Sequence, residues 1–166
     1  MFERKVINLS YKIVINETKL GFTASHFLTN HPTCGTIHGH NYGVTVSIEV
    51  KEGFLDNNYM VIDFHDLKKI ILNIIEKLDH KLMIPENSNE LEIGKKKDIV
   101  EVKVKPSDKT YIFPSRDIVF LPISATTAEC LARFIFKEIQ KELQIKEYNM
   151  IVRIHENRGC YSEYSE

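Results

Sequence analysis

The sequence lacks tryptophan and has only three cysteines, Cys34, Cys130 and Cys160. They form no CxxC pair, and an odd number of thiols argues against a disulfide framework. This cysteine usage is typical of a reducing compartment, so we expect a cytoplasmic protein. No apolar run is long enough to span a membrane, and the opening residues 1–5 do not resemble a secretory signal.

An excess of charge of either sign is also absent. The chain has 22 basic and 23 acidic residues, a formal net charge of −1, and no electrostatic footprint for nucleic acid or an anionic membrane. The one basic run, at residues 95–97, is interpreted as a solvated loop. With 166 residues, 43% of them hydrophobic, the chain can bury a core of its own. We therefore predict one domain over residues 1–166, with no nucleic-acid and no membrane partner.

Strand patterns dominate the first third of the chain. Residues 5–15 are rich in β-branched side chains, residues 16–21 have turn composition, and a second strand follows over residues 22–26. Residues 41–51 alternate between valine or isoleucine and polar side chains, which is typical of a half-buried strand.

Helical periodicity appears twice. Residues 64–78 carry an apolar stripe that begins at Phe64, and Asp63 is a plausible N-cap. A second helix is predicted over residues 127–143, where Thr126 and Glu129 have the spacing of a capping box.

The region between the helices, residues 85–124, is predicted to be an inserted excursion. Residues 99–105 and 111–113 suggest a hairpin within it, and a last strand is expected over residues 149–156. The order β-β-α-(hairpin)-α-β predicts an α+β domain in which two helices cover one face of an antiparallel sheet.

Three histidines carry the strongest chemical signal. His38 and His40 are two residues apart on a strand and project from the same face, and His26 can return beside them across a hairpin. Three imidazoles without an evident fourth ligand describe an open zinc site. The cupin arrangement fails on spacing, because the next acidic residue after the pair is Glu49.

Cys34 lies four residues before His38 and has three interpretations, which the sequence leaves open. It could be a small buried hydrophobe, a fourth ligand that closes a structural zinc module, or a thiolate acting as a base or nucleophile. Gly35 beside it favours an exposed loop. A zinc hydrolase that activates water would use the three histidines without needing this thiol.

Other polar residues are more ambiguous. Asp79 and His80 pair a carboxylate with an imidazole, although a cation at a helix C-terminus is the favoured explanation when the pair is taken alone. Glu156 ends the last strand on its apolar face, where it either emerges into solvent or meets ligand N–H groups. Thr127 is interpreted first as a helix cap. The remaining histidines, read as ordinary surface or core residues, are His31, His65 and His155.

Taken together, these residues resemble the 6-pyruvoyl-tetrahydropterin synthase and 6-carboxy-tetrahydropterin synthase family. The ordered motifs extend over most of the chain: Phe22-Thr-Ala-Ser-His26, Cys34-x-x-x-His38-Gly39-His40-Asn41-Tyr42, Val61-Ile-Asp63-Phe64, Leu78-Asp-His80-Lys, Thr126-Thr-Ala-Glu129 and Ile154-His-Glu156. The resemblance implies the tunnelling fold (T-fold), in which β-β-α-α-β-β subunits, here with an inserted hairpin, join into a barrel. It also implies a homohexamer, a dimer of trimers, with active sites at subunit interfaces.

The resemblance further implies roles for nine residues. The zinc ligands would be His26, His38 and His40, the catalytic residues Cys34, Asp79 and His80, and the pterin-side residues Glu156, Thr127 and Glu129. The implied substrate is 7,8-dihydroneopterin triphosphate, from which triphosphate is eliminated as the side chain rearranges.

Two features set this chain apart from the family pattern. Cys130 stands where the family usually has asparagine, and residues 85–124 are longer than compact members need. The short spacing from Cys34 to His38 favours a 6-carboxy-tetrahydropterin synthase of the queuosine-type pathway. A 6-pyruvoyl-tetrahydropterin synthase is the alternative.

Overall fold

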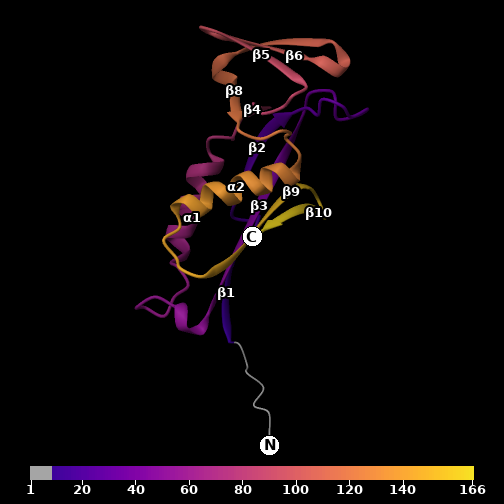
Figure 1. Ribbon diagram of the computed structural model, residues 1–166. Coiled ribbons are helices and arrows are strands. Elements are labelled where there is room, and N and C mark those ends of the chain that lie inside the picture. Colours follow the sequence, from indigo (N-terminus) through magenta and orange to yellow (C-terminus); the bar gives the residue numbers. More distant parts are fainter. Residues whose placement is uncertain (1–8) are drawn as a thin grey trace, which may run out of the picture.

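The computed structural model describes residues 9–166 and contains ten strands and two α-helices within that range (Figure 1). The strands are β1 (Ser10–Ile15), β2 (Gly21–His26), β3 (His38–Lys51), β4 (Lys81–Pro85), β5 (Leu91–Lys96), β6 (Ile99–Val104), β7 (Lys109–Pro114), β8 (Ile118–Leu121), β9 (Tyr148–Asn157) and β10 (Cys160–Ser165). The helices are α1 (Phe64–Ile75) and α2 (Ala128–Glu142), and three short 3-10 helices are η1 (Glu52–Phe54), η2 (Lys105–Ser107) and η3 (Ser115–Asp117). The first predicted strand, residues 5–15, is represented by β1, and its residues 5–8 lie outside the described range.

The main sheet has seven strands in the order β10-β9-β3-β2-β4-β8, with β1 also pairing with β3. Strand β3 is 14 residues long, so β2 and β1 pair one after the other along one of its edges while β9 pairs along the other. These pairs are antiparallel, but β2 with β4 and β4 with β8 are parallel. The sequence predicts an antiparallel sheet. The observed sheet is mixed, because β4 and β8 add two parallel pairings to the antiparallel part.

The main core lies between the sheet and the two helices. The inward side chains of β3 are Val44, Val46, Ile48 and Val50, each at most 2% exposed, as their alternation predicts. Both helices contribute buried apolar side chains to the same cluster, and α2 crosses the sheet beside β9 and β10 (Figure 1). Because these apolar faces leave water together, their burial is the main stabilising contribution to this part of the fold.

The opposite face of β3 is less exposed than its polar residues suggest. Thr45 is 5% and Ser47 4% exposed. The turn after β1 folds Glu17 over Gly43, where a Cβ would approach the Glu17 Cβ to 2.7 Å. The Thr45 hydroxyl donates to Glu17 Oε2 at 2.8 Å and lies 3.1 Å from His155 Nε2. His155, interpreted as an ordinary histidine, is thus part of a polar cluster on this face.

Helix α1 begins where the sequence predicts. The Asp63 carboxylate accepts a hydrogen bond from the His65 N–H and caps the helix. The helix ends at Ile75, three residues early, and residues 76–80 form turns in which the Leu78 N–H donates to the Ile75 carbonyl at 2.9 Å. The chain then enters β4 through His80, which has a φ of 57°. Phe64, expected in the buried stripe, is 57% exposed because it occupies the first turn at the helix end.

The predicted capping box of helix α2, with Thr126 as the N-cap, is wrong. Its N-cap is Thr127, whose side chain accepts from the Cys130 N–H at 3.4 Å. Thr126 is completely buried, and its hydroxyl donates to the Phe27 carbonyl at 3.3 Å. Thr126 cannot cap the helix because its side chain is engaged with the strand that carries His26.

The excursion contains more than the predicted hairpin. Strands β6 and β7 form that hairpin, but β5 adds to it in a three-stranded antiparallel sheet, called the inserted sheet below. A second apolar cluster joins this sheet to the main one; its buried members are Phe27, Leu82, Ile84, Leu91, Val100, Val102, Val104 and Ile118. Lys95 and Lys96 lie in β5, not in a loop, and the Lys95 ammonium sits 3.9 Å from the centre of the Phe120 ring.

The C-terminal strand β9 matches the predicted strand at residues 149–156 within one residue at each end. A further strand, β10, pairs antiparallel with it and supplies the final strand that the family resemblance implies. In the described part of the chain, no helix is both long and apolar enough to cross a membrane.

Candidate metal centre and active site

Strands β2 and β3 bring the three histidines together. In their antiparallel register His26 lies opposite His38, and His40 follows two residues later on the same face. The ring centres are 4.5 Å apart for His26 and His38, 5.2 Å for His26 and His40, and 5.0 Å for His38 and His40. One donor atom from each residue lies within 4.8 Å of the others, so the cluster could hold a metal ion.

Hydrogen bonds on the outer side of the cluster select its donor atoms. His26 Nδ1 lies 2.9 Å from the Thr126 carbonyl, and His38 Nδ1 lies 2.7 Å from the Thr36 carbonyl. A carbonyl only accepts, so each Nδ1 carries the proton and each Nε2 presents a lone pair. The two Nε2 atoms are 3.1 Å apart, where two lone pairs repel unless a cation lies between them.

The environment of His26 and His40 also fits metal binding. Burial lowers the pKa of the His26 imidazole, which favours the neutral form that binds a metal. His40 Nε2 is buried and has no hydrogen-bond partner among the described residues. A buried nitrogen without a partner is costly, and a metal ion would compensate it.

Glu156 lies beside the same nitrogens. Its Oε1 is 3.4 Å from His26 Nε2 and 3.3 Å from His40 Nε2, and the Tyr42 hydroxyl donates to it at 3.5 Å. Burial and this carboxylate together raise the pKa of Tyr42, so the phenol stays protonated and can donate. The Glu156 side chain, 28% exposed, is therefore only partly in solvent, and it borders the candidate metal centre.

A cavity of about 280 Å³ opens at the histidines. It brings together seven of the nine residues predicted for the site, with Ser162 from β10 as an additional lining residue. The seven are His26, His38, His40, Cys34, Thr127, Glu129 and Glu156.

Cys34 borders this cavity on a short loop between β2 and β3. Among the described residues, the histidine cluster is the one group of histidine, cysteine or carboxylate side chains whose donor atoms lie close enough to hold a metal ion, and Cys34 is not in it. This geometry favours a thiol near the metal centre over a fourth ligand. The Cys34 N–H donates to His31 Nδ1 at 2.9 Å, so His31, interpreted as an ordinary histidine, shapes this loop.

Glu129 and Ser162 also line the cavity. Glu129 lies in the first turn of α2, and the Ser162 hydroxyl donates to its carboxylate at 2.9 Å. Its own backbone N–H, Ser162 and the Thr127 hydroxyl together lower the pKa of Glu129, so it remains ionised. Ser162 was not predicted, because the residue patterns gave no strand after residue 156 and only the family resemblance implied one; residues 160–165 do not alternate cleanly between apolar and polar side chains.

Asp79 and His80 form a pair, but outside the cavity. His80 Nδ1 lies 2.8 Å from Asp79 Oδ2, and Asp79 Oδ1 accepts from the Thr23 N–H at 2.8 Å. That backbone donor, with His80, lowers the pKa of Asp79. The His80 side chain is 81% exposed, so within one subunit the structure does not bring this pair to Cys34.

Comparison with known proteins identifies the family. The sequence model for 6-pyruvoyl tetrahydropterin synthase matches residues 16–166. The chain belongs to this family. That membership places it among the pterin synthases and bears out the resemblance in its motifs.

Two curated relatives of this pterin synthase cover most of both chains. A Methanocaldococcus jannaschii protein, provisionally named 6-carboxy-5,6,7,8-tetrahydropterin synthase, is 37% identical over 89% of this chain and 92% of its own length. The Haemophilus influenzae 6-carboxy-5,6,7,8-tetrahydropterin synthase is 33% identical over 89% of this chain and 96% of its own length.

Solved structures confirm the predicted tunnelling fold of the synthase. The Plasmodium falciparum 6-pyruvoyl tetrahydropterin synthase superimposes with a TM-score of 0.86 at 23% identity, over 96% of this chain and 99% of its own. The Caenorhabditis elegans enzyme of the same name gives a TM-score of 0.57 at 19% identity, over 95% of both chains. At these identities the likeness concerns the fold.

Proposed function

We propose that this pterin synthase is a zinc-dependent lyase that converts 7,8-dihydroneopterin triphosphate to 6-carboxy-5,6,7,8-tetrahydropterin. The observation that carries the proposal is the cluster of histidine nitrogens at a cavity that also contains Cys34, Glu129 and Glu156. Imidazole nitrogen suits zinc, and three protein ligands leave the open position of a catalytic site. The names of the relatives at 33% and 37% identity support the 6-carboxy product.

The side chains around the cavity suit this reaction. A bound zinc would supply Lewis acidity toward the side-chain oxygens of the substrate. Cys34, as a thiolate, would remove a proton from the adjacent carbon, and the Asp79–His80 pair would relay protons. The carboxylates of Glu156 and Glu129, with Thr127 nearby, would accept hydrogen bonds from the N–H groups of the pterin ring.

The product decides between the 6-carboxy and 6-pyruvoyl alternatives. We expect zinc-loaded protein incubated with 7,8-dihydroneopterin triphosphate to consume one water and release triphosphate, a two-carbon aldehyde and a pterin that retains one of the three side-chain carbons, measured by mass spectrometry. Retention of all three carbons as a pyruvoyl group would identify the alternative. Loss of phosphate with an intact side chain would instead indicate a zinc hydrolase, and unchanged substrate would contradict an enzymatic role.

Assembly would complete the site. Asp79 and His80 lie outside the cavity of their own subunit, and β8 and β10 end the main sheet on its two sides. Edge strands are available for pairing with other subunits. A cytoplasmic homohexamer, a dimer of trimers, would let a neighbour supply the Asp79–His80 pair to each cavity.

Light scattering tests this assembly. We expect a mass about six times that of the 19.3 kDa chain at micromolar concentration, because closed symmetric rings pair the exposed strand edges. A monomeric mass would contradict both the barrel and a shared active site.

The change Glu156→Gln tests pterin recognition. One acceptor oxygen becomes an amide donor facing the ligand's N–H edge, so we expect pterin binding to weaken by roughly 2 kcal/mol or more. Calorimetry with a pterin that lacks the reactive side chain measures this contact separately from catalysis.

A matched control is Glu163→Gln, which alters the carboxylate paired with Arg153 away from the cavity. It should leave pterin affinity unchanged. Zinc content should remain normal in both variants. Unaltered affinity in Glu156→Gln would exclude this residue as the anchor, and loss of zinc would assign it to the metal instead.

A further inference from the structure

The loop at residues 28–36 carries Cys34 and begins and ends on the second apolar cluster. Phe27, which precedes the loop and follows His26, is 2% exposed and packs with its ring centre 5.5 Å from that of Tyr111 on β7. Ile37, between the loop and His38, packs against the same cluster. The residues that flank the loop at both ends therefore pack in a cluster that contains side chains of the inserted sheet.

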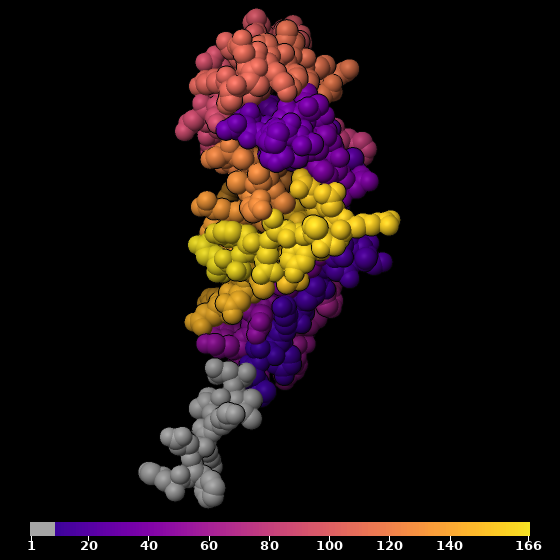
Figure 2. Space-filling view, turned by 90° about the vertical axis from the view of Figure 1, so that its right-hand side faces the viewer, coloured from indigo at the N-terminus to yellow at the C-terminus, as the bar shows by residue number. Residues whose placement is uncertain are grey.

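Two polar contacts add to this seating. The Lys109 ammonium, at the start of β7, donates to the Gly35 carbonyl at 3.1 Å. The Thr29 hydroxyl donates to the Glu90 carboxylate, just before β5. In Figure 2 the purple surface that contains the loop lies directly beneath the salmon-coloured inserted sheet. The inserted sheet thus holds the loop on both sides of Cys34.

The loop itself is tightly closed. The Leu28 N–H donates to the Cys34 carbonyl at 2.8 Å, and the Gly35 N–H donates to the His31 carbonyl at 3.0 Å. A Cβ at Gly35 would come within 2.6 Å of that His31 carbonyl oxygen, so a side chain would not fit without a shift of the backbone. The backbone at Gly35, next to Cys34, therefore has little room, and the Lys109 ammonium on the Gly35 carbonyl restricts it further.

We propose that the inserted sheet positions the Cys34 thiol over the metal centre, and that Lys109 is the positioning residue through its bond to Gly35. This inference rests on the proposed function, because it assigns Cys34 to the reaction. Lys109 bonds the carbonyl of Gly35, the residue directly after Cys34, whereas His26 and His38 are held by the carbonyls of Thr126 and Thr36. Losing Lys109 would therefore disturb the thiol and leave the metal centre intact.

The test is Lys109→Met, which keeps much of the stem and removes the N–H donors from an exposed residue. We expect kcat to fall roughly tenfold while KM changes by less than about twofold, because the substrate contacts remain and the base is misplaced. Zinc content should be unchanged. Amide hydrogen exchange of peptides spanning residues 27–37 should become about tenfold faster.

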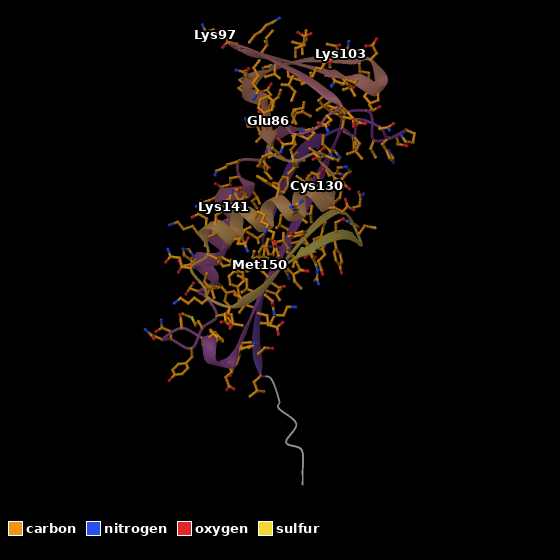
Figure 3. The ribbon with its side chains drawn as sticks, in the orientation of Figure 1. Glu86, Lys97, Lys103, Cys130, Lys141 and Met150 are labelled. Atoms are coloured by element: carbon orange, nitrogen blue, oxygen red, sulfur yellow. The ribbon has the colours of Figure 1, made fainter. Side chains whose placement is uncertain are left out.

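Two further variants make the result specific. Lys109→Arg keeps a cationic donor and should restore both kcat and slow exchange. Lys96→Met is the control, because Lys96 lies at the other end of the inserted sheet from Lys109. Figure 3 labels Lys97, next to Lys96, at one end of this sheet and Lys103 toward the other. Lys103 pairs with Thr110, the neighbour of Lys109. The Lys96→Met variant should change neither quantity.

Normal kcat or normal exchange in Lys109→Met would overturn the proposal. A loss of zinc, or equal effects in Lys96→Met, would also overturn it, because the contact would then be generally structural. If the wild-type protein shows no turnover, the proposed function fails, whereas the exchange measurement still decides whether Lys109 holds the loop.

Discussion

Replacing Cys34 with alanine is expected to lower turnover by about a hundredfold or more while leaving the metal in place. The thiol borders the cavity, but it is not in the group formed by the three histidines. Removing a general base eliminates the proton acceptor and does not alter the nitrogen donors. Steady-state kinetics and metal analysis on the same preparation measure the two quantities.

Cys160→Ala is the matched control, because this thiol is exposed at the start of β10. It should retain full turnover. If Cys34→Ala loses its metal, the thiol is a ligand and the structural zinc module becomes the better description. Full turnover in Cys34→Ala would remove the thiol from the mechanism.

Removing the His40 imidazole should have the largest effect on the metal. In His40→Ala we expect zinc affinity to fall by at least about a hundredfold, since even the loss of a supporting contact to a ligand costs 10- to 100-fold. The buried Nε2 of His40 makes no hydrogen bond in residues 9–166, with Glu156 Oε1 3.3 Å away, and a metal ion would satisfy its lone pair. Turnover should be lost with the metal.

The variant His65→Ala provides the comparison for His40→Ala. His65 is an exposed residue in the first turn of α1, so its replacement by alanine should leave zinc content unchanged. Metal analysis after dialysis against a zinc buffer measures both variants, and His38→Ala should behave like His40→Ala. Full zinc occupancy in both ligand variants would disprove the assignment.

The strongly periodic segments could be predicted from the sequence. The alternation in β3 and the stripe in α1 are local signals, because every second residue of a strand and every third or fourth residue of a helix face the same side. The Asp63 cap was predictable for the same reason. The cap of α2 was not, because Thr126 and Thr127 are both acceptable locally and only the contact with Phe27 distinguishes them.

The same division applies to the candidate site. The spacing of His38 and His40 determined that their side chains share a face, and the motif set indicated the family. Strand pairing was needed to place His26 opposite His38, to bring Glu156 beside them and to bring Ser162 to Glu129. Such contacts join residues far apart in sequence, and no local pattern encodes their distances.

The sequence by itself determined which chemical groups are available to this pterin synthase: three imidazoles, one nearby thiol and the carboxylates that surround them in the structure. The tertiary structure decided which of these meet. It separates Asp79 and His80 from the cavity and seats the Cys34 loop on the inserted sheet. The reason is physical: side-chain type and local periodicity are properties of a few neighbouring residues, whereas a cavity is formed by strands and helices that pack only when the whole core leaves water.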